Sequence, residues 1–125
     1  MKILLVEDNF LNQKVVIFHL QKKNYEVVST DNGIDALKII ENEDIDLILM
    51  DIMLPGMNGF EITAEIRKRE RRDKTEQKVP IIAVTANTLD NDREKCLNAG
   101  MNEYLPKPFT AQDLYRVIGE CTTSV

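Results

Sequence analysis

The chain has 125 residues, a length typical of one domain, and is 43% hydrophobic and 30% charged. No apolar stretch approaches the roughly 20 residues of a membrane-spanning helix, and Lys2 leads directly into a short strand, so we expect a cytoplasmic, monomeric protein with no leader and no membrane insertion. The net charge of −5 argues against nucleic acid as a partner. Cys96 and Cys121 lack metal-ligand spacing; a disulfide stays open, but we expect free thiols.

The first predicted element is a buried strand over Lys2–Val6, an uninterrupted apolar run after its first residue. It ends in two adjacent carboxylates, Glu7 and Asp8. Adjacent carboxylates repel each other, and a hard cation is the commonest reason for placing them together. The alternative is that they favour the N-terminus of the next helix through its dipole, and both interpretations stay open at this point.

The next predicted element is a helix over Asn9–Lys23, with Asn9 as its N-cap. Its apolar residues cover more than one helical face and are Leu11, Val15, Val16, Phe18 and Leu20. Because packing on a sheet needs a single apolar stripe, we expect one stripe to stay at least partly exposed. His19 has no second histidine or cysteine nearby, so we expect an ordinary helix residue and not a metal ligand.

A β-rich alternating segment, Tyr25–Thr30, predicts an edge strand. The turn Asp31–Gly33 then leads into a short helix with apolar residues at helical spacing. These residues are Ala36, Leu37, Ile39 and Ile40.

The segment Asp46–Asp51 predicts a strand buried on both faces, because Leu47–Met50 is an unbroken apolar run. Asp51 stands at its end, Pro55 then favours a loop, and Gly59 opens a new helical pattern. In open α/β sheets, ligands collect at the carboxyl ends of the strands. Asp51 is therefore a candidate functional residue, although a turn or cap role would explain a single aspartate equally well.

That helix ends in a basic segment over residues 67–78 with seven basic and three acidic residues, so it nets +4 while the rest of the chain nets −9. One interpretation is a nucleic-acid patch, but no aromatic residues are interleaved with the charges. We favour a solvated helix end and loop.

The last part of the chain predicts two more strands, over Pro80–Val84 and Glu103–Leu105. Between them we expect a helix that ends near Ala99, with Gly100 as its C-cap. A final helix is predicted over Asp113–Cys121, with Leu114, Val117 and Ile118 facing inward.

Five strand–helix units with short connections predict a parallel sheet with helices on both faces. The strand ends lie along one edge, and four of them carry polar side chains, which are Glu7 and Asp8, Asp51, Thr85, and Lys107. The carboxylates suit Mg²⁺, and the lysine and threonine supply donors to a phosphoryl group. Asp51 is then a nucleophile that forms an aspartyl phosphate, with the metal neutralising the repulsion between anions.

The chain resembles, over its whole length, the receiver domain of two-component response regulators. The segments that carry the resemblance are V-E-D-N at 6–9, M-D-I-M-L-P-G-M-N-G at 50–59, V-T-A at 84–86 and K-P-F at 107–109. The resemblance implies a single receiver domain over residues 1–125. It implies an α/β fold, a doubly wound (βα)5 parallel sheet with the flavodoxin-like strand order 2-1-3-4-5.

The resemblance also implies a role for each polar side chain at the sheet edge. Asp51 is implied as the phosphoacceptor, with Lys107 and Thr85 contacting the phosphoryl group. The implied Mg²⁺ ligands are Glu7, Asp8, Asp51 and the backbone carbonyl of Met53. Tyr104 is implied to change rotamer with Thr85 on activation, and the Lys107–Pro108 bond to be cis.

The opening V-E-D-N-F-L-N-Q-K and the basic segment before Pro80 are most similar to receivers of hybrid histidine kinases, which exchange phosphoryl groups with histidine phosphotransfer domains. We therefore expect a histidine kinase or a histidine phosphotransfer domain as partner, docking on Leu11, Val15 and Phe18. We expect no enzyme activity beyond the domain's own phosphorylation and dephosphorylation. No output domain fits after the last helix, so the chain is either a stand-alone receiver or a piece of a longer protein.

Two other classes share parts of this pattern. A flavodoxin-like cofactor module has the same architecture, but it needs a Ser/Thr/Gly-rich phosphate loop where this chain has E-D-N-F-L-N. A haloacid-dehalogenase-type phosphatase shares the aspartate nucleophile, but it needs a second aspartate where Met53 stands. We therefore favour the receiver.

Overall fold

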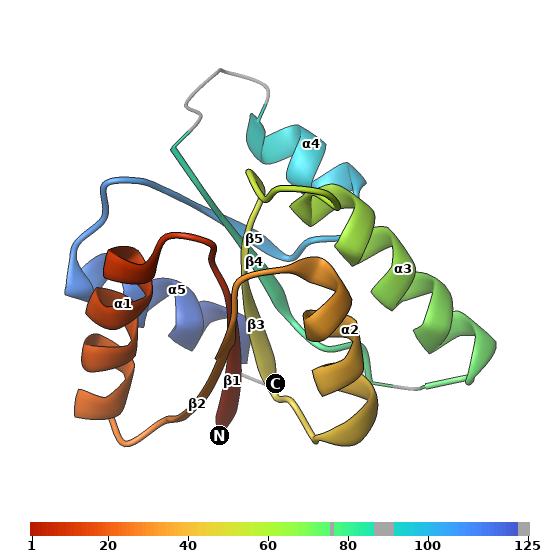
Figure 1. The fold of residues 1–125 in the computed structure, drawn as a ribbon, viewed down its shortest axis with the longest axis horizontal. Coiled ribbons are helices and arrows are strands. Elements are labelled where there is room, and N and C mark those ends of the chain that lie inside the picture. Colours follow the sequence, from red (N-terminus) through yellow and green to blue (C-terminus); the bar gives the residue numbers. More distant parts are fainter. Residues whose placement is uncertain (76, 87–91, 123–125) are drawn as a thin grey trace.

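The computed structural model describes residues 1–75, 77–86 and 92–122. In these residues five strands alternate with five helices along the chain (Figure 1). The strands are β1 (Lys2–Val6), β2 (Glu26–Thr30), β3 (Leu47–Asp51), β4 (Ile81–Thr85) and β5 (Glu103–Pro106). The helices are α1 (Phe10–Lys22), α2 (Gly33–Asn42), α3 (Gly59–Arg72), α4 (Asp92–Asn98) and α5 (Ala111–Thr122). All paired strands are parallel and their order is β2-β1-β3-β4-β5, which confirms the predicted doubly wound sheet.

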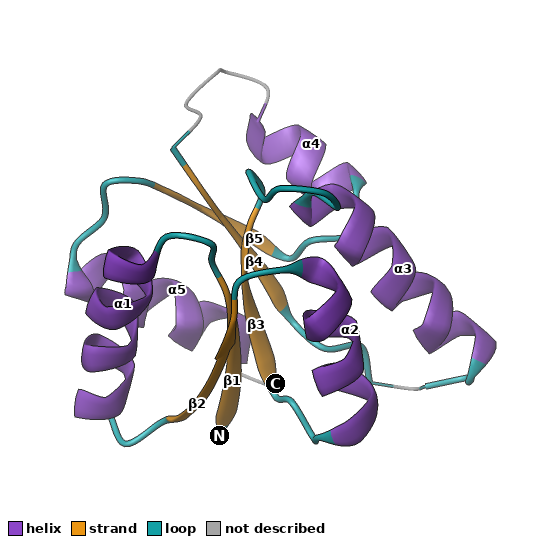
Figure 2. Ribbon diagram, in the orientation of Figure 1, coloured by secondary structure: helices purple, strands orange, loops and turns teal. Residues whose placement is uncertain are grey.

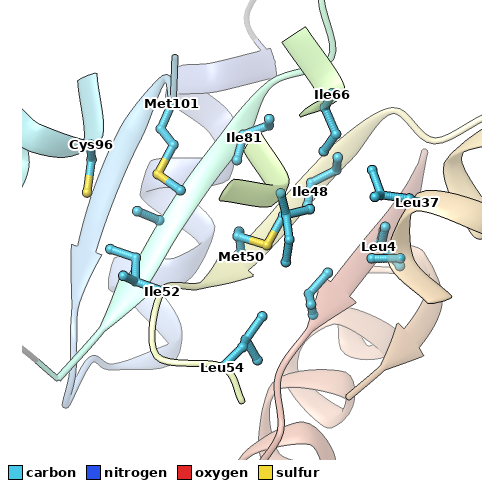
Figure 3. Packing of buried hydrophobic residues seen from close by; sticks show 14 residues of the cluster. Leu4, Leu37, Ile48, Met50, Ile52, Leu54, Ile66, Ile81, Cys96 and Met101 are labelled. Carbon is cyan, nitrogen blue, oxygen red and sulfur yellow. The ribbon is translucent and has the colours of Figure 1, made fainter. Parts of the chain in front are cut away.

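The sheet separates two layers of helices (Figure 2): α1 and α5 lie on one face, and α2, α3 and α4 lie on the other. Strand residues alternate between the two hydrophobic clusters beneath these layers, so that Ile3 and Leu5 face α1 and α5 while Leu4 faces the other helices. Figure 3 shows the cluster on the α2–α4 side, with Met50 and Ile81 near its centre. Because β1, β3 and β4 are covered on both faces, each needs an unbroken apolar run.

Helix α1 buries one apolar stripe and exposes another. Its residues Val16 and Leu20 are buried in the cluster between α1, α5 and the sheet. By contrast, Leu11, Val15 and Phe18 are 72%, 55% and 56% exposed. The expectation that one of the two stripes stays in solvent is confirmed.

Asparagine caps fix where three helices begin. The side chains of Asn9, Asn32 and Asn58 each accept a hydrogen bond from a backbone N–H three residues ahead. Each of these residues stands in a loop that leaves the carboxyl end of a strand, so the caps place the three helix N-termini at the same edge of the sheet.

Helix α5 begins earlier than predicted, whereas helix α4 ends where it was predicted to end. Helix α5 begins at Ala111, two residues before the predicted start, because Thr110 and Asp113 bond reciprocally at 3.1 and 3.0 Å. The predicted helix after Ala86 includes residues 87–91, which lie outside the described residues. Its end is as predicted, since Gly100 follows α4 with a φ of 103°.

The basic segment was predicted to be solvated, but its first residue, Arg67, is buried. Arg67 is only 8% exposed, and its guanidinium donates to the carbonyl of Gly100 at 2.9 Å, to Asn102 Oδ1 at 2.9 Å and to Glu70 at 2.8 Å. Arg67 therefore ties α3 to the turn after α4. Arg71 and Arg72 are exposed, as predicted. Within the described residues, no helix is long and apolar enough to cross a membrane.

Gly59 allows α3 to begin directly against the end of β3. A Cβ atom on Gly59 would lie 2.7 Å from the carbonyl oxygen of Asp51 and 2.8 Å from the Cα of Ile52. Its backbone N–H donates to the carbonyl of Ile52 at 3.0 Å. The main chain that carries Asp51 is therefore held by a contact that only glycine permits.

We expect Gly59→Ala to lower the free energy of unfolding by about 1–3 kcal/mol, because the added methyl group overlaps rigid backbone atoms. The matched control is Gly119→Ala in α5, where a Cβ meets nothing within 4 Å. That change is expected to be neutral or to stabilise the helix by up to about 1 kcal/mol. Urea unfolding of both variants measures the difference, and equal effects would contradict the account of Gly59.

Candidate active site

Three charged side chains reach the carboxyl edge of the sheet on the side of α1 and α5. In β1, β3 and β5 the last buried residues that face these helices are Leu5, Leu49 and Leu105. Two residues further along each segment come Glu7, Asp51 and Lys107, and side chains two apart in extended chain share a face. The strand period thus brings two carboxylates and an ammonium group together.

The ammonium group lies between the two carboxylates. Lys107 Nζ is 2.8 Å from Glu7 Oε1 and 3.5 Å from Asp51 Oδ2. Glu7 and Asp51 are only 3% and 5% exposed. Main-chain N–H groups hold the remaining oxygens, because Asn9 donates to Glu7 at 3.2 Å and Met53 donates to Asp51 at 3.0 Å. The sequence predicted that these residues meet, but not that Lys107 pairs with Glu7.

Burial and mutual repulsion separate the protonation behaviour of the two carboxyl groups. Burial raises the pKa of Asp51 to about 7, and the hydrogen bond and charge of Glu7 act in the same direction. Burial also acts to raise the pKa of Glu7, but hydrogen bonds with Asp51 and Lys107 outweigh it and lower that pKa. Burial acts to lower the pKa of Lys107, yet its carboxylate partners raise it. In the absence of another cation, Asp51 therefore holds a proton more readily than Glu7 does.

Asp8 adds a third carboxylate at the solvent side. One oxygen from each of Glu7, Asp8 and Asp51 lies within 4.8 Å of the other two, and Asp8 is exposed. Three converging carboxylate oxygens with one open side suit Mg²⁺, which takes oxygen ligands and keeps several waters. The donor set therefore fits the predicted metal. Met53 lies beside these carboxylates, because its backbone N–H donates a hydrogen bond to Asp51 Oδ1.

Thr85 lies at the same edge of the sheet, and Tyr104 lies further back in β5. Thr85 is 1% exposed at the end of β4, and its carbonyl accepts the backbone N–H of Lys107 at 2.8 Å. Tyr104 pairs in register with Ala83 and packs against the cluster under α2–α4. The Lys107–Pro108 bond is cis, as predicted. The switching role of Thr85 and Tyr104 stays a prediction.

A cleft of about 420 Å³ opens beside the carboxylates. Glu7 and Lys107 line it, together with Val15 of α1 and Phe109 of the loop before α5. Of the three predicted docking residues, Val15 therefore adjoins the charged cluster directly. His19 also lines the cleft; its ring contacts Phe18 edge-on at 5.6 Å, as an ordinary helix residue would.

A second contact at this edge was also not predicted. The side-chain amide of Gln13 in α1 donates to the carbonyl of Glu7, six residues earlier. The helical pattern gives Gln13 no partner within its own helix face, so sequence reasoning could not find this bond. No signal in the sequence singles out Gln13, which lies five residues beyond Asp8.

Comparison with known proteins identifies the family. Residues 3–119 match the family described as the response regulator receiver domain. The chain belongs to this family, whose members act in two-component and phosphorelay signalling.

Similar proteins are receivers within longer signalling proteins. The chain is 41% identical over 120 residues to hybrid signal transduction histidine kinase B of Dictyostelium discoideum, covering 90% of this chain and 6% of that protein. It is 35% identical over 117 residues to sensor protein GacS of Pseudomonas syringae pv. syringae, covering 94% of this chain and 13% of that protein. The chain thus spans a small part of the length of these relatives.

Two solved structures show the same fold. The receiver domain of sensor histidine kinase PA1611 from Pseudomonas aeruginosa PAO1, which has a magnesium ion coordinated in its active-site cleft, is 46% identical with a TM-score of 0.85 and 98% coverage of both chains. The receiver domain of Saccharomyces cerevisiae Ssk1, in a complex with the histidine phosphotransfer protein Ypd1, is 32% identical with a TM-score of 0.91. That match covers 97% of this chain and 88% of the Ssk1 chain.

The raised pKa of Asp51 predicts how stability depends on pH without divalent cations. Between the ordinary value of 3.8 and about 7, the folded state binds more protons at Asp51 than the unfolded state does, so stability falls as pH rises. The lowered pKa of Glu7 acts in the opposite sense, but only below about its ordinary value of 4.5. From pH 5 to 7.5 we therefore expect a loss of at most about 1.4 kcal/mol per pH unit.

Urea unfolding in a chelating buffer at several pH values measures this loss, with Asp51→Asn as the comparison. The variant cannot ionise at position 51, so its stability is expected to change less over the same interval. Identical pH profiles for the two proteins would contradict the assignment of the shifted pKa to Asp51.

Proposed function

We propose that Asp51 of this receiver domain accepts a phosphoryl group from a phosphohistidine of a histidine kinase or a histidine phosphotransfer protein. The observation that carries this proposal is the convergence of Asp51, Glu7, Asp8 and Lys107 at the open edge of the sheet. A buried structural ion pair needs one carboxylate for one ammonium. Three carboxylates around a single lysine leave an excess of negative charge, which suits a site that binds a cation and then an anionic group.

The reaction is a transfer between two nucleophiles. A carboxylate oxygen of Asp51 forms a bond to phosphorus as the phosphorus–nitrogen bond of phosphohistidine breaks, and the imidazole nitrogen leaves with the bonding electrons. Lys107 is the first proposed donor to the phosphoryl oxygens, and its Nζ lies 3.5 Å from Asp51 Oδ2. The buried hydroxyl-bearing residue at the same edge, Thr85, is the second proposed donor.

We propose Mg²⁺ as the cation, held by Glu7, Asp8, Asp51 and the carbonyl of Met53. The three converging carboxylate oxygens and the magnesium in the PA1611 receiver support this choice. When bound, Mg²⁺ neutralises the charge that would otherwise repel a phosphoryl group from Asp51.

The signal is proposed to leave the site through Thr85 and Tyr104. Tyr104 packs against the cluster on the α2–α4 side, and Thr85 follows Ala83 of that cluster by two residues in β4. A movement of Thr85 toward a phosphoryl group would therefore change the packing around Tyr104. The domain then acts as a switch and not as an enzyme with a separate substrate, because the phosphoryl group that it accepts becomes bound to its own Asp51. We propose that the domain acts in the cytoplasm, because Cys96 and Cys121 form no disulfide with each other and reduced cysteines suit that compartment.

Labelling by a small phosphodonor tests the chemistry. With Mg²⁺ and acetyl phosphate, the wild type is expected to gain one acid-stable, base-labile phosphoryl group, detected by intact mass. Asp51→Asn keeps the shape and removes the nucleophile, so it is expected to stay folded and unlabelled. Asp44→Asn, at an exposed position near the amino end of β3, is the matched control and should label like the wild type. Stoichiometric labelling of Asp51→Asn would contradict the proposal.

The exposed stripe of α1 is the proposed docking surface for the phosphodonor protein. Leu11, Val15 and Phe18 are apolar and more than half exposed, and Val15 lines the cleft that reaches Glu7 and Lys107. Exposed apolar groups beside a reactive site mark interaction surfaces. An apolar helix face laid along α1 would bring a phosphohistidine to Asp51, and the Ssk1 receiver is known in a complex with such a phosphotransfer protein.

Charge substitution on α1 separates docking from chemistry. Leu11→Lys combined with Val15→Lys is expected to slow phosphotransfer from a phosphorylated histidine phosphotransfer protein at least tenfold, while labelling by acetyl phosphate stays unchanged. Leu97→Lys on α4, which is also an exposed apolar position, should affect neither rate. If the α1 variant slows both donors equally, the surface is not a docking site.

A further inference from the structure

Gln13 connects helix α1 to the end of the first strand, directly behind the charged cluster. Its side-chain amide donates to the carbonyl of Glu7 and, at 3.4 Å, to the carbonyl of Thr30 at the end of β2. The Thr30 carbonyl also accepts the backbone N–H of Glu7 at 3.0 Å. One side chain from α1 therefore joins the carboxyl ends of two neighbouring strands.

This bond meets a need that the fold creates. Val6 is the last residue of β1 that pairs with a neighbouring strand, so the carbonyl of Glu7 lies beyond the ladder while the residue itself is 3% exposed. A buried carbonyl requires a donor, and the half-buried Gln13 supplies one.

Further bonds close a ring around Glu7. The N–H of Asn9 donates to the Glu7 carboxylate at 3.2 Å, and the N–H of Gln13 donates to the carbonyl of Asn9 at 3.0 Å. Asn9 also caps α1 through the N–H of Asn12 at 2.9 Å. Both the main chain and the carboxylate of Glu7 are therefore fixed to the first turn of α1.

We propose that Gln13 is a positioning residue for the divalent cation: by holding the main chain of Glu7 it keeps the carboxylates of Glu7 and Asp8 near that of Asp51. It does not touch the ion. Groups that orient metal ligands from behind commonly change metal affinity by about tenfold or more when they are removed. This inference rests on the proposed Mg²⁺ site, and it adds a residue that sets the affinity of that site.

The test is Mg²⁺ binding by the unphosphorylated chain, measured by isothermal titration calorimetry and by the rise of the melting temperature with Mg²⁺ concentration. Gln13→Met keeps the length of the side chain and removes the donor, so the Mg²⁺ dissociation constant should rise about tenfold. Gln21→Met, an exposed position on the same helix, is the matched control and should bind like the wild type. Asp8→Asn, which lacks a ligand, defines lost binding.

The measurement separates positioning from a purely structural role. Loss of a hydrogen bond alone would lower the melting temperature without Mg²⁺ and leave the dissociation constant unchanged, and that result would overturn the inference. Gln13→Asn keeps the amide but is one methylene shorter, so it should also bind Mg²⁺ more weakly; it decides the matter if Gln13→Met does not fold. If Gln13→Met and Gln13→Asn both bind Mg²⁺ with wild-type affinity, the inference about Gln13 is wrong but the proposed Mg²⁺ site stands. If the wild type does not bind Mg²⁺, the proposed site itself is wrong.

Discussion

The repulsion between carboxylates at one edge of the sheet is the constraint on which the rest of the structure depends. In the parallel sheet the ends of β1 and β3 lie side by side, so the buried acids Glu7 and Asp51 lie close together. The exposed Asp8, which follows Glu7, adds a third carboxylate. Like charges in a partly buried site interact strongly, because little water screens them. Lys107 balances part of this charge from the end of β5. The remaining negative charge favours a bound cation, and we propose that this cation lets Asp51 meet an anionic phosphoryl group.

The two helical layers contact different residues around this site. On one side, α1 supports Glu7 through Gln13 and Asn9 and presents an apolar surface to solvent. On the other side, Tyr104 packs against the cluster under α2, α3 and α4, and Thr85 stands at the end of β4. We therefore propose that chemistry and docking take place on the α1 side and that the structural response takes place on the α4 side. The sheet edge is the element that both sides share.

Much of this could be predicted from the sequence, because β1, β3 and β4 are apolar runs that end in, or are followed at once by, a polar residue. The alternation that puts Glu7, Asp51 and Lys107 on one face is a property of extended chain, and the parallel order of the strands then brings them to one edge. The direct pairing of Lys107 with Glu7, the bond from Gln13 and the burial of Arg67 could not be predicted, because each joins residues distant in the chain or on different elements. The early start of α5 was missed because Thr110 and Asp113 were not recognised as a reciprocal cap.

The central claim is that this edge of the sheet makes Asp51 the phosphoacceptor. Reduction of the phosphorylated protein with borohydride converts an aspartyl phosphate to homoserine, and peptide mass spectrometry then locates the modified residue. The account predicts homoserine at position 51 alone, formed only when Mg²⁺ was present during phosphorylation. Homoserine at position 8, or modification that does not depend on Mg²⁺, would contradict it.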